Sequence, residues 1–219
     1  MNASLKLLIA LVLSLEISVT KSISLNIILV AFSFVYVIWH RPSWKQFAYL
    51  FFIPLLPAFG SWSSLYLYGT GDHIHMAWVM FTRIFAYVWI GASLTMTTTT
   101  DDLLTSLEQN AKLPSTFVYG MLGAFNFIPR IGHELNTIKI SARMRGEVLH
   151  FWSPQIFFKA ILTSLNWSTN LSQAMTSHGF AEGAPRTHYQ TIKIPSWNWP
   201  VSFVIIISSL AYLIFSPLR

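Results

Sequence analysis

The sequence contains no cysteine and few charged residues. The absence of cysteine from its 219 residues excludes disulfides, thiolate metal sites and cysteine nucleophiles. Only 10% of the residues are charged, whereas about a quarter is usual for a soluble domain. Hydrophobic residues make up 53%, and the mean hydropathy is +0.52. This composition indicates an integral membrane protein.

Motifs that would give the chain its own catalysis are also missing. None of the ten glycines stands in a Gly-x-x-x-x-Gly-Lys phosphate loop, and neither Gly-x-Ser-x-Gly nor His-Glu-x-x-His occurs. Lys and Arg never follow each other directly, so the formal charge of +6 is scattered and gives no sign of nucleic-acid binding. We expect no catalytic residues, no cofactor and no nucleic-acid partner.

One short segment contains the residue types of a metal site. Asp72, His73 and His75 supply the carboxylate and imidazole ligands that zinc or nickel accepts. Alternate histidines share one metal only in an extended or looped segment, and no third imidazole stands nearby. We therefore expect a solvated loop without a metal.

Five apolar runs come near the length of about 20 residues that a helix needs to cross a bilayer. They fall at residues 7–20, 23–39, 47–68, 76–96 and 199–216. The first run resembles a signal sequence, but Glu16 interrupts it and no cleavage pattern follows, so we expect a retained span. The first two runs are short, and a re-entrant hairpin is the alternative to two spans. The sequence thus predicts about five transmembrane helices.

Four residues inside these runs are unusual for a span. Pro54 and Pro57 each remove a backbone donor and should kink the third helix. Glu16 and Arg83 place charges in apolar surroundings, where an unpaired charge is costly. Snorkelling to the interface is one solution for them, and a mutual ion pair is the other.

The distribution of basic residues predicts the orientation, because cytoplasmic loops retain Lys and Arg. The loop 40–46 is basic, and the segment 97–196 carries Lys112, Arg130, Lys139, Arg143, Arg145, Lys159, Arg186 and Lys193. Both belong in the cytoplasm, which puts the N-terminus inside and the C-terminus outside. The predicted domains are N-terminal transmembrane helices over 1–96, a cytosolic domain over 97–196 and a C-terminal transmembrane helix over 197–219.

The predicted cytosolic domain shows helical periodicity and is no linker. Its first helix follows the threonines 97–100, has two aspartates in its first turn and is ended by Pro114. A second apolar stretch, 117–128, stops at Pro129. Its length would allow a span, but its polar residue and charged flanks favour an interfacial or core helix.

Two long amphipathic helices follow in the sequence. The first begins at Arg130, carries its apolar residues at i, i+4 and i+7, and ends at Gly146. The second begins after Ser153 and Pro154, a cap and a first-turn proline, and ends at Gly179.

Each amphipathic helix ends in a basic residue followed by glycine. The two ends read Met144-Arg145-Gly146 and Ser177-His178-Gly179. Glycine closes a helix in the left-handed conformation, and a basic residue suits the negative end of the helix dipole. That accounts for a single such ending. For a pair on the cytosolic face of a membrane protein, the alternative is that Arg145 and His178 project into grooves of a partner.

In these segments the chain resembles the transmembrane T component of energy-coupling factor (ECF) transporters, the family that includes CbiQ-like permeases. The resemblance covers the segment 95–190, and its motifs lie at 97–104, 127–129, 138–146, 174–180 and 185–187. The family's ending is Ala-Arg-Gly or close to it. Met144 replaces alanine at the first end, and His178 replaces arginine at the second, where imidazole cannot form a two-pronged contact with a carboxylate.

The resemblance implies an importer of four parts in the cell (inner) membrane. These are this multi-pass chain, two ABC ATPase subunits that dock on the cytosolic helices, and one substrate-binding membrane (S) subunit held by the spans. ATP-driven motion would pass through the helix ends to the S subunit. The coupling residues that it implies are Arg143, Met144, Arg145, Gly146, Ser177, His178, Gly179 and Arg186. Thiamine precursors, other vitamins, cobalt and nickel all fit as cargo.

Two other functions would explain parts of the sequence. A membrane enzyme acting on a lipid or prenyl substrate would need clustered acids, and Asp101-Asp102 is the only acidic pair. A substrate-binding membrane subunit would have no need of the large cytosolic segment. Copurification separates these alternatives, because only a coupling subunit should bring two nucleotide-binding proteins with it.

Overall fold

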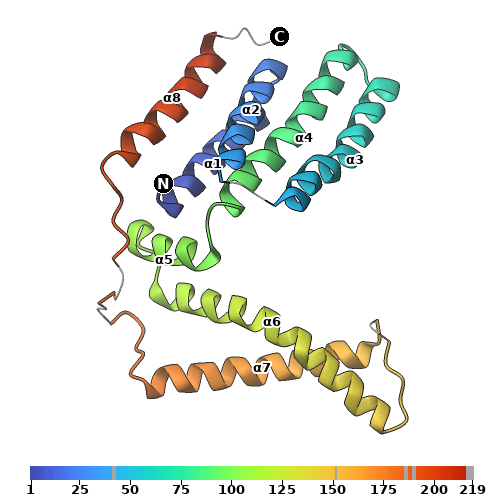
Figure 1. Ribbon diagram of the computed structural model, residues 1–219, viewed down its shortest axis with the longest axis vertical. Coiled ribbons are helices and arrows are strands. Elements are labelled where there is room, and N and C mark those ends of the chain that lie inside the picture. Colours follow the sequence, from blue (N-terminus) through green and yellow to red (C-terminus); the bar gives the residue numbers. More distant parts are fainter. Residues whose placement is uncertain (41–42, 151, 185–186, 189–190, 216–219) are drawn as a thin grey trace. The chain divides into compact units, whose positions relative to one another are not determined.

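The computed structural model describes residues 1–40, 43–150, 152–184, 187–188 and 191–215 (Figure 1). In these residues the regular structure is entirely helical, which confirms the predicted all-α class. The helices are α1 (Ala3–Val19), α2 (Ile23–Trp39), α3 (Trp44–Tyr68), α4 (His73–Thr95), α5 (Thr100–Ala111), α6 (Ser115–Met144), α7 (Pro154–Ser177) and α8 (Asn198–Phe215).

The chain folds as two compact units. The first unit comprises Met1–Ser106 and Ile192–Arg219, and the second comprises Leu107–Thr191. Helices α1 to α4 and α8 belong to the first unit, whereas α6 and α7 form the second. The predicted domains 1–96, 97–196 and 197–219 refer to the membrane and stay a prediction.

The five predicted apolar runs correspond to α1, α2, α3, α4 and α8. Helices α3 and α4, of 25 and 23 residues, are long and apolar enough to cross a bilayer. Helices α1 and α2 have 17 residues each, about 26 Å at 1.5 Å per residue, which is close to the hydrocarbon thickness of about 30 Å. The membrane class is confirmed, and the count of five spans stays a prediction.

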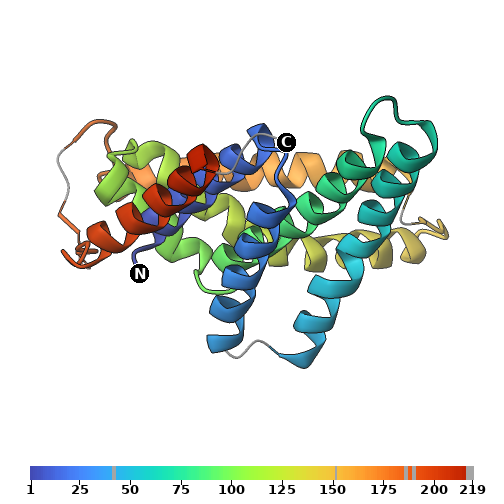
Figure 2. The same cartoon turned by 90° about the horizontal axis from the view of Figure 1, so that it is seen from above.

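Helix α4 lies at the centre of the first unit, between α2 and α3 (Figures 1 and 2). Ile9, Leu13 and Ile17 recur at i, i+4 spacing on α1 and form a buried stripe, which packs against Ala86 and Ile90 of α4. Residues of α8 cover the same core. The core therefore joins the N-terminal helices to the last one.

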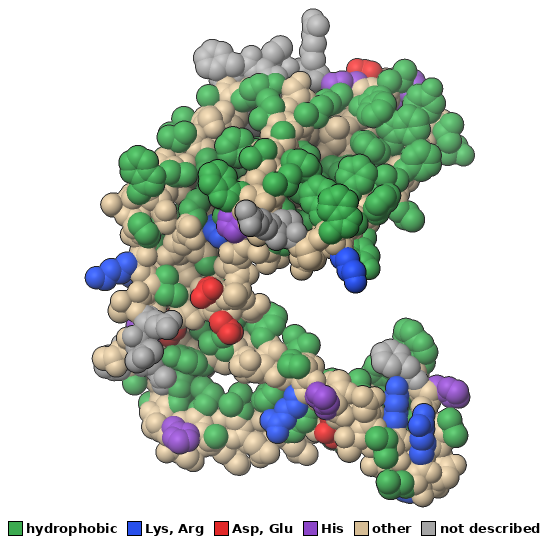
Figure 3. Space-filling view, viewed as in Figure 1, with side chains coloured by type: hydrophobic (Ala, Val, Ile, Leu, Met, Phe, Trp, Pro, Cys, Tyr) green, Lys and Arg blue, Asp and Glu red, His purple; other side chains and the backbone are tan. Residues whose placement is uncertain are grey.

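The outer face of the first unit is apolar. Phe32, Phe52, Leu56 and Val204 are 65% to 80% exposed, and hydrophobic side chains cover most of the face seen in Figure 3. A soluble protein rarely exposes so large an apolar surface. Contact with lipid or with another membrane protein accounts for it.

Prolines do not interrupt the helices. Helix α3 continues through Pro54 and Pro57, and the expected kink stays a prediction. The expected stop at Pro129 is wrong, because α6 runs continuously from Ser115 to Met144 with Pro129 inside it. A proline inside a helix removes one hydrogen bond and crowds the preceding turn, so packing must offset this cost.

The ring of Trp167 on α7 supplies packing on both sides of Pro129. Its centroid lies 5.6 Å from that of Phe127, before the proline, and 5.1 Å from the guanidinium carbon of Arg130, after it. Aromatic and cation–π contacts of this kind stabilise by about 0.5–1.5 kcal/mol each. We attribute the continuity of α6 to this support from α7, which local sequence patterns do not reveal.

The predicted threonine cap at the start of α5 is confirmed. The backbone N–H of Asp102 donates to the Thr99 hydroxyl at 3.1 Å, and that hydroxyl donates to the Asp102 carboxylate at 2.7 Å. Helix α5 then ends at Ala111, three residues before Pro114.

The start of α1 is fastened to α5 through Asn2. Its side-chain oxygen accepts a hydrogen bond from the backbone N–H of Ser4 at 3.1 Å, and another from the hydroxyl of Ser106. Asn2 is 7% exposed. One buried amide oxygen therefore caps α1 and connects it to α5.

Replacement of Asn2 tests this connection. We expect Asn2→Ala to lower the stability of the protein by about 1–2 kcal/mol, because a helix cap and a buried acceptor are lost together. Thermal unfolding in detergent measures the change. Asn166→Ala, at an exposed position on α7, is the matched control and should leave the unfolding temperature unchanged. Equal shifts for the two variants would contradict this role of Asn2.

Candidate functional site

Helix α6 is closed by a glycine in the left-handed conformation. Gly146 has a φ of 80°. Its N–H donates to the Arg143 carbonyl at 3.0 Å, and the N–H of Glu147 reaches back to the Ala142 carbonyl at 3.0 Å. This pair of bonds is the Schellman motif, which satisfies carbonyls left free at a helix C-terminus.

Helix α7 ends in the same way. Gly179 has a φ of 81°. Its N–H donates to the Thr176 carbonyl at 3.0 Å, and the N–H of Phe180 donates to the Met175 carbonyl at 2.9 Å. The similarity between the two endings that the sequence suggested is therefore a similarity of backbone structure.

Arg145 and His178 hold equivalent positions in these endings. Each is the C-cap residue before the glycine, with φ and ψ of −93° and 6° for Arg145 and −85° and 12° for His178. Both residues are exposed. We call residues 143–146 the α6 tip and residues 177–179 the α7 tip.

The seven predicted coupling residues that the structure describes all lie at the tips and are exposed. They are Arg143, Met144, Arg145, Gly146, Ser177, His178 and Gly179. Arg186, the eighth, lies outside the described residues.

Helices α6 and α7 run antiparallel, which puts the tips at opposite ends of the pair (Figures 1 and 2). Two ring contacts agree with the antiparallel direction, because the earlier residue of α6 meets the later residue near α7. Phe127 packs on Trp167, and Tyr119 packs on Phe180 with ring centroids 6.0 Å apart. The helices have 30 and 24 residues, or about 45 Å and 36 Å at 1.5 Å per residue. The tips thus lie well apart, at opposite ends of the packed pair.

A leucine side chain of α7 packs closely against the backbone of α6 at Gly123. A Cβ atom added to Gly123 of α6 would lie 2.7 Å from Cδ2 of Leu171 on α7. A side chain at position 123 would therefore require the end of the Leu171 side chain to shift.

A groove lies beside the α7 tip. It has a volume of about 690 Å³ and is bounded by residues of both helices, among them Tyr119 and Asn126 of α6 and His178 and Phe180 near the end of α7. The His178 position therefore borders a concave surface.

The sequence-based prediction missed residues that follow the α6 tip. Val148 is 72% exposed and Trp152 is 82% exposed, and Met144 within the tip is 83% exposed. Figure 3 shows hydrophobic and basic side chains together at the end of α6 and the turn into α7. The sequence does hold a signal for this patch, because apolar residues stand there between two polar helix ends.

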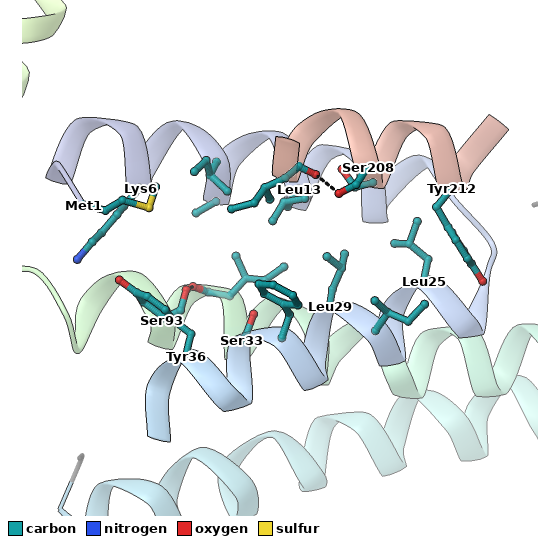
Figure 4. Close-up of a pocket in the computed structure, with 17 residues that line it drawn as sticks. Met1, Lys6, Leu13, Leu25, Leu29, Ser33, Tyr36, Ser93, Ser208 and Tyr212 are labelled. Atoms are coloured by element: carbon teal, nitrogen blue, oxygen red, sulfur yellow. Dashed lines mark hydrogen bonds between the residues drawn. The ribbon is translucent and has the colours of Figure 1, made fainter. Parts of the chain in front are cut away.

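The first unit contains an apolar cavity of about 310 Å³ between α1, α2, α4 and α8. Lys6 and Tyr36 lie toward one end and Tyr212 at the other, with leucine side chains such as Leu13 and Leu29 between them (Figure 4). No Asp, Glu or His lines it in the part of the chain that the structure describes. The mostly apolar lining of the cavity suits an apolar group.

Of the two alternatives for Glu16 and Arg83, the mutual ion pair is not formed. The guanidinium of Arg83 donates instead to the carbonyl of Thr20, the C-cap of α1, at 2.6 Å. No hydrogen bond or ion pair joins the buried Glu16 carboxylate to Arg83 in the part of the chain that the structure describes. The free carbonyl at the negative end of α1 holds the cation one helical turn away from the acid.

His73 and His75 lie in the first turn of α4 and are half-buried, so the expectation of a solvated loop at these residues is wrong. Ring nitrogens of His73 and His75 lie 3.0 Å from the carbonyls of Gly71 and Lys21, respectively. The Asp72 carboxylate caps α4 by accepting from the His75 backbone N–H at 3.5 Å. The described residues contain no group of three or more His, Cys, Asp or Glu side chains that could hold a metal.

Comparison with known proteins gives one match. A family model described as CbiQ, cobalt transport protein, matches residues 1–189. This includes both tips and four of the five apolar helices. No curated protein matches the chain significantly. The match confirms the resemblance found in the tip motifs.

Substitution of the closing glycines tests the tip geometry. We expect Gly146→Ala and Gly179→Ala each to destabilise the protein by about 1 kcal/mol, because an L side chain is strained at positive φ. Gly132→Ala within α6 is the matched control. Nothing lies within 4 Å of an added Cβ there, so it should be neutral or stabilise by about 0.5–1 kcal/mol. Thermal unfolding in detergent measures all three, and a destabilising Gly132→Ala of equal size would contradict the assignment.

Proposed function

Because this chain belongs to the CbiQ family of cobalt transport proteins, we propose that it is the transmembrane coupling subunit of an ECF-type importer. In this proposal two ABC ATPase subunits dock on the α6 and α7 tips. A substrate-binding membrane (S) subunit contacts the helices of the first unit. The chain itself is not catalytic and transmits the motion that ATP produces in its partners.

The observation that carries this proposal is the pair of equivalent Schellman endings on one antiparallel helix pair. Gly146 and Gly179 have nearly equal φ angles, and each follows an exposed C-cap residue. Two like ends facing away from each other fit two docking partners of one protein class. A single binding partner would give no reason for two such ends.

The packing of α6 on α7 supports a mechanical role. Trp167 contacts residues on both sides of Pro129, and Leu171 fills the space beside Gly123. A displacement imposed at one tip therefore moves the pair as a body, since packed interfaces do not deform continuously. Arg143, the first residue of the α6 tip, and Arg186 would add charged contacts to the ATPases.

The first unit has properties that suit contact with an S subunit and lipid. Its outer surface is apolar, and α3 buries little more than Pro54 and Ala58. In this proposal the protein is a multi-pass protein of the cell membrane, with α6 and α7 in the cytoplasm. The family description names cobalt, and we propose a transition metal or a vitamin as cargo, recognised by the S subunit.

Charge reversal at the α6 tip tests the proposed function. We expect Arg145→Glu to remain in the membrane but to reduce recovery of the ATPase subunits and transport at least about tenfold, because a buried charge contact is worth 2–5 kcal/mol at an interface. Copurification after co-expression and cargo uptake measure the effects.

Lys112→Glu is the control for that experiment. Lys112 is an exposed residue of the same unit, in the connection between α5 and α6 and outside both tips. It should retain wild-type recovery and uptake. Unchanged recovery and uptake in Arg145→Glu would overturn the proposed function.

A further inference from the structure

The two tips have the same backbone but present different surfaces. At the second position after each C-cap, α6 has Glu147 and α7 has Phe180. The ring of Phe180 packs against Tyr119 of α6 at 6.0 Å, so the apolar residue of this ending is turned toward its own helix pair. The charged Glu147 is exposed.

The α6 tip is basic and apolar. At the tip and just beyond it, Arg143 and Arg145 provide two positive charges against the one negative charge of Glu147. The side chains of Met144, Val148 and Trp152 are 72% to 83% exposed beside them. Such a surface is costly in water and complements an acidic groove with apolar walls.

The α7 tip has almost no charge. No Lys or Arg occurs between Lys159 and Arg186, and Glu182 is the only acidic residue there. Ser177 and His178 offer a hydroxyl and an imidazole, which has neither the permanent charge nor the forked donors of a guanidinium. A complementary groove needs hydrogen-bonding groups and no acid.

We propose that the two tips bind grooves of different chemistry on their ATPase partners. The α6 tip, with Val148 and Trp152, enters an acidic groove with apolar walls, and the α7 tip enters an uncharged polar groove. This inference rests on the proposed function. It adds that the two docking sites are not interchangeable, and that Val148 and Trp152 belong to the first of them.

An exchange of the C-cap residues tests the inference. The double variant Arg145→His, His178→Arg keeps the composition, the net charge and both Schellman endings. It is co-expressed with tagged ABC ATPase subunits from the same organism, and the ATPase recovered per chain is measured in detergent. We expect at least a tenfold loss relative to wild type. Recovery equal to wild type would show equivalent grooves and overturn the inference.

The dependence of ATPase recovery on salt concentration tests which tip makes ionic contacts. We expect the recovery of ATPase by the wild type to fall with rising salt, and the dependence to be weaker in Arg145→Gln, because only the α6 tip makes ionic contacts. His178→Gln should keep the wild-type salt dependence. The same reduction in both variants would overturn the assignment of charge to one tip.

The apolar part of the site is tested at Trp152. Trp152→Ala should lower ATPase recovery about tenfold at every salt concentration, because the loss is hydrophobic and not ionic. Trp197→Ala is the matched control, since Trp197 is 77% exposed in the first unit, and it should recover ATPase like wild type. Unchanged recovery by Trp152→Ala would remove this residue from the site.

The bilayer surface is the other partner that a basic tip with an exposed tryptophan could meet. In proteoliposomes that carry the ATPase complex, brominated phospholipid quenches tryptophans in contact with lipid. Trp152→Phe should leave the fluorescence intensity lost on quenching unchanged, and a clear fall in that intensity would place Trp152 in the membrane and overturn the inference. If the wild type recovers no ATPase at all, the proposed function itself fails, whereas failure of the exchange alone leaves that function intact.

Discussion

The contact between α6 and α7 is the constraint on which the proposed site depends. Trp167 bridges Phe127 and Arg130, and Leu171 fits where Gly123 has no side chain. These contacts keep a long helix continuous across a proline and fix the antiparallel direction of the pair. Without them each tip would still have a closed end, but its distance and direction from the other tip would vary. Coupling needs both to be fixed, because motion passes only through parts that keep their geometry.

At the two tips, the backbone determines the shape and the side chains determine the chemistry. The shape comes from backbone hydrogen bonds and from glycines at positive φ, and it is the same at Gly146 and Gly179. The chemistry comes from the side chains around it, and it differs between Arg145 and His178. A substitution at the C-cap can therefore change which partner surface is recognised without changing how the helix ends. This explains how histidine can stand in an arginine position with the ending preserved.

Sequence patterns predicted what depends on local structure. Apolar runs, the Thr99 cap and both glycine endings were found because each is decided within a few residues. The stop at Pro129 failed because Trp167, distant in sequence, supports the helix there. The pairing of Glu16 with Arg83 failed because a backbone carbonyl, which no side-chain pattern reveals, was the nearer acceptor. The exposed residues after the α6 tip were missed because exposure is a property of the folded chain.

In the first unit, the central and the edge helices differ in how many of their residues are buried, and this difference agrees with their proposed roles. Helix α4 contacts α1, α2 and α3 and contributes buried residues such as Ala86, Trp89 and Ile90. Helix α3 at the edge buries only Pro54 and Ala58 of its 25 residues and exposes large apolar side chains. A helix that packs so little on its own chain is stable in a membrane only where lipid or another protein covers it. The edge that α3 forms is thus the part of this unit whose packing is completed from outside the chain, which agrees with the proposed contact with an S subunit.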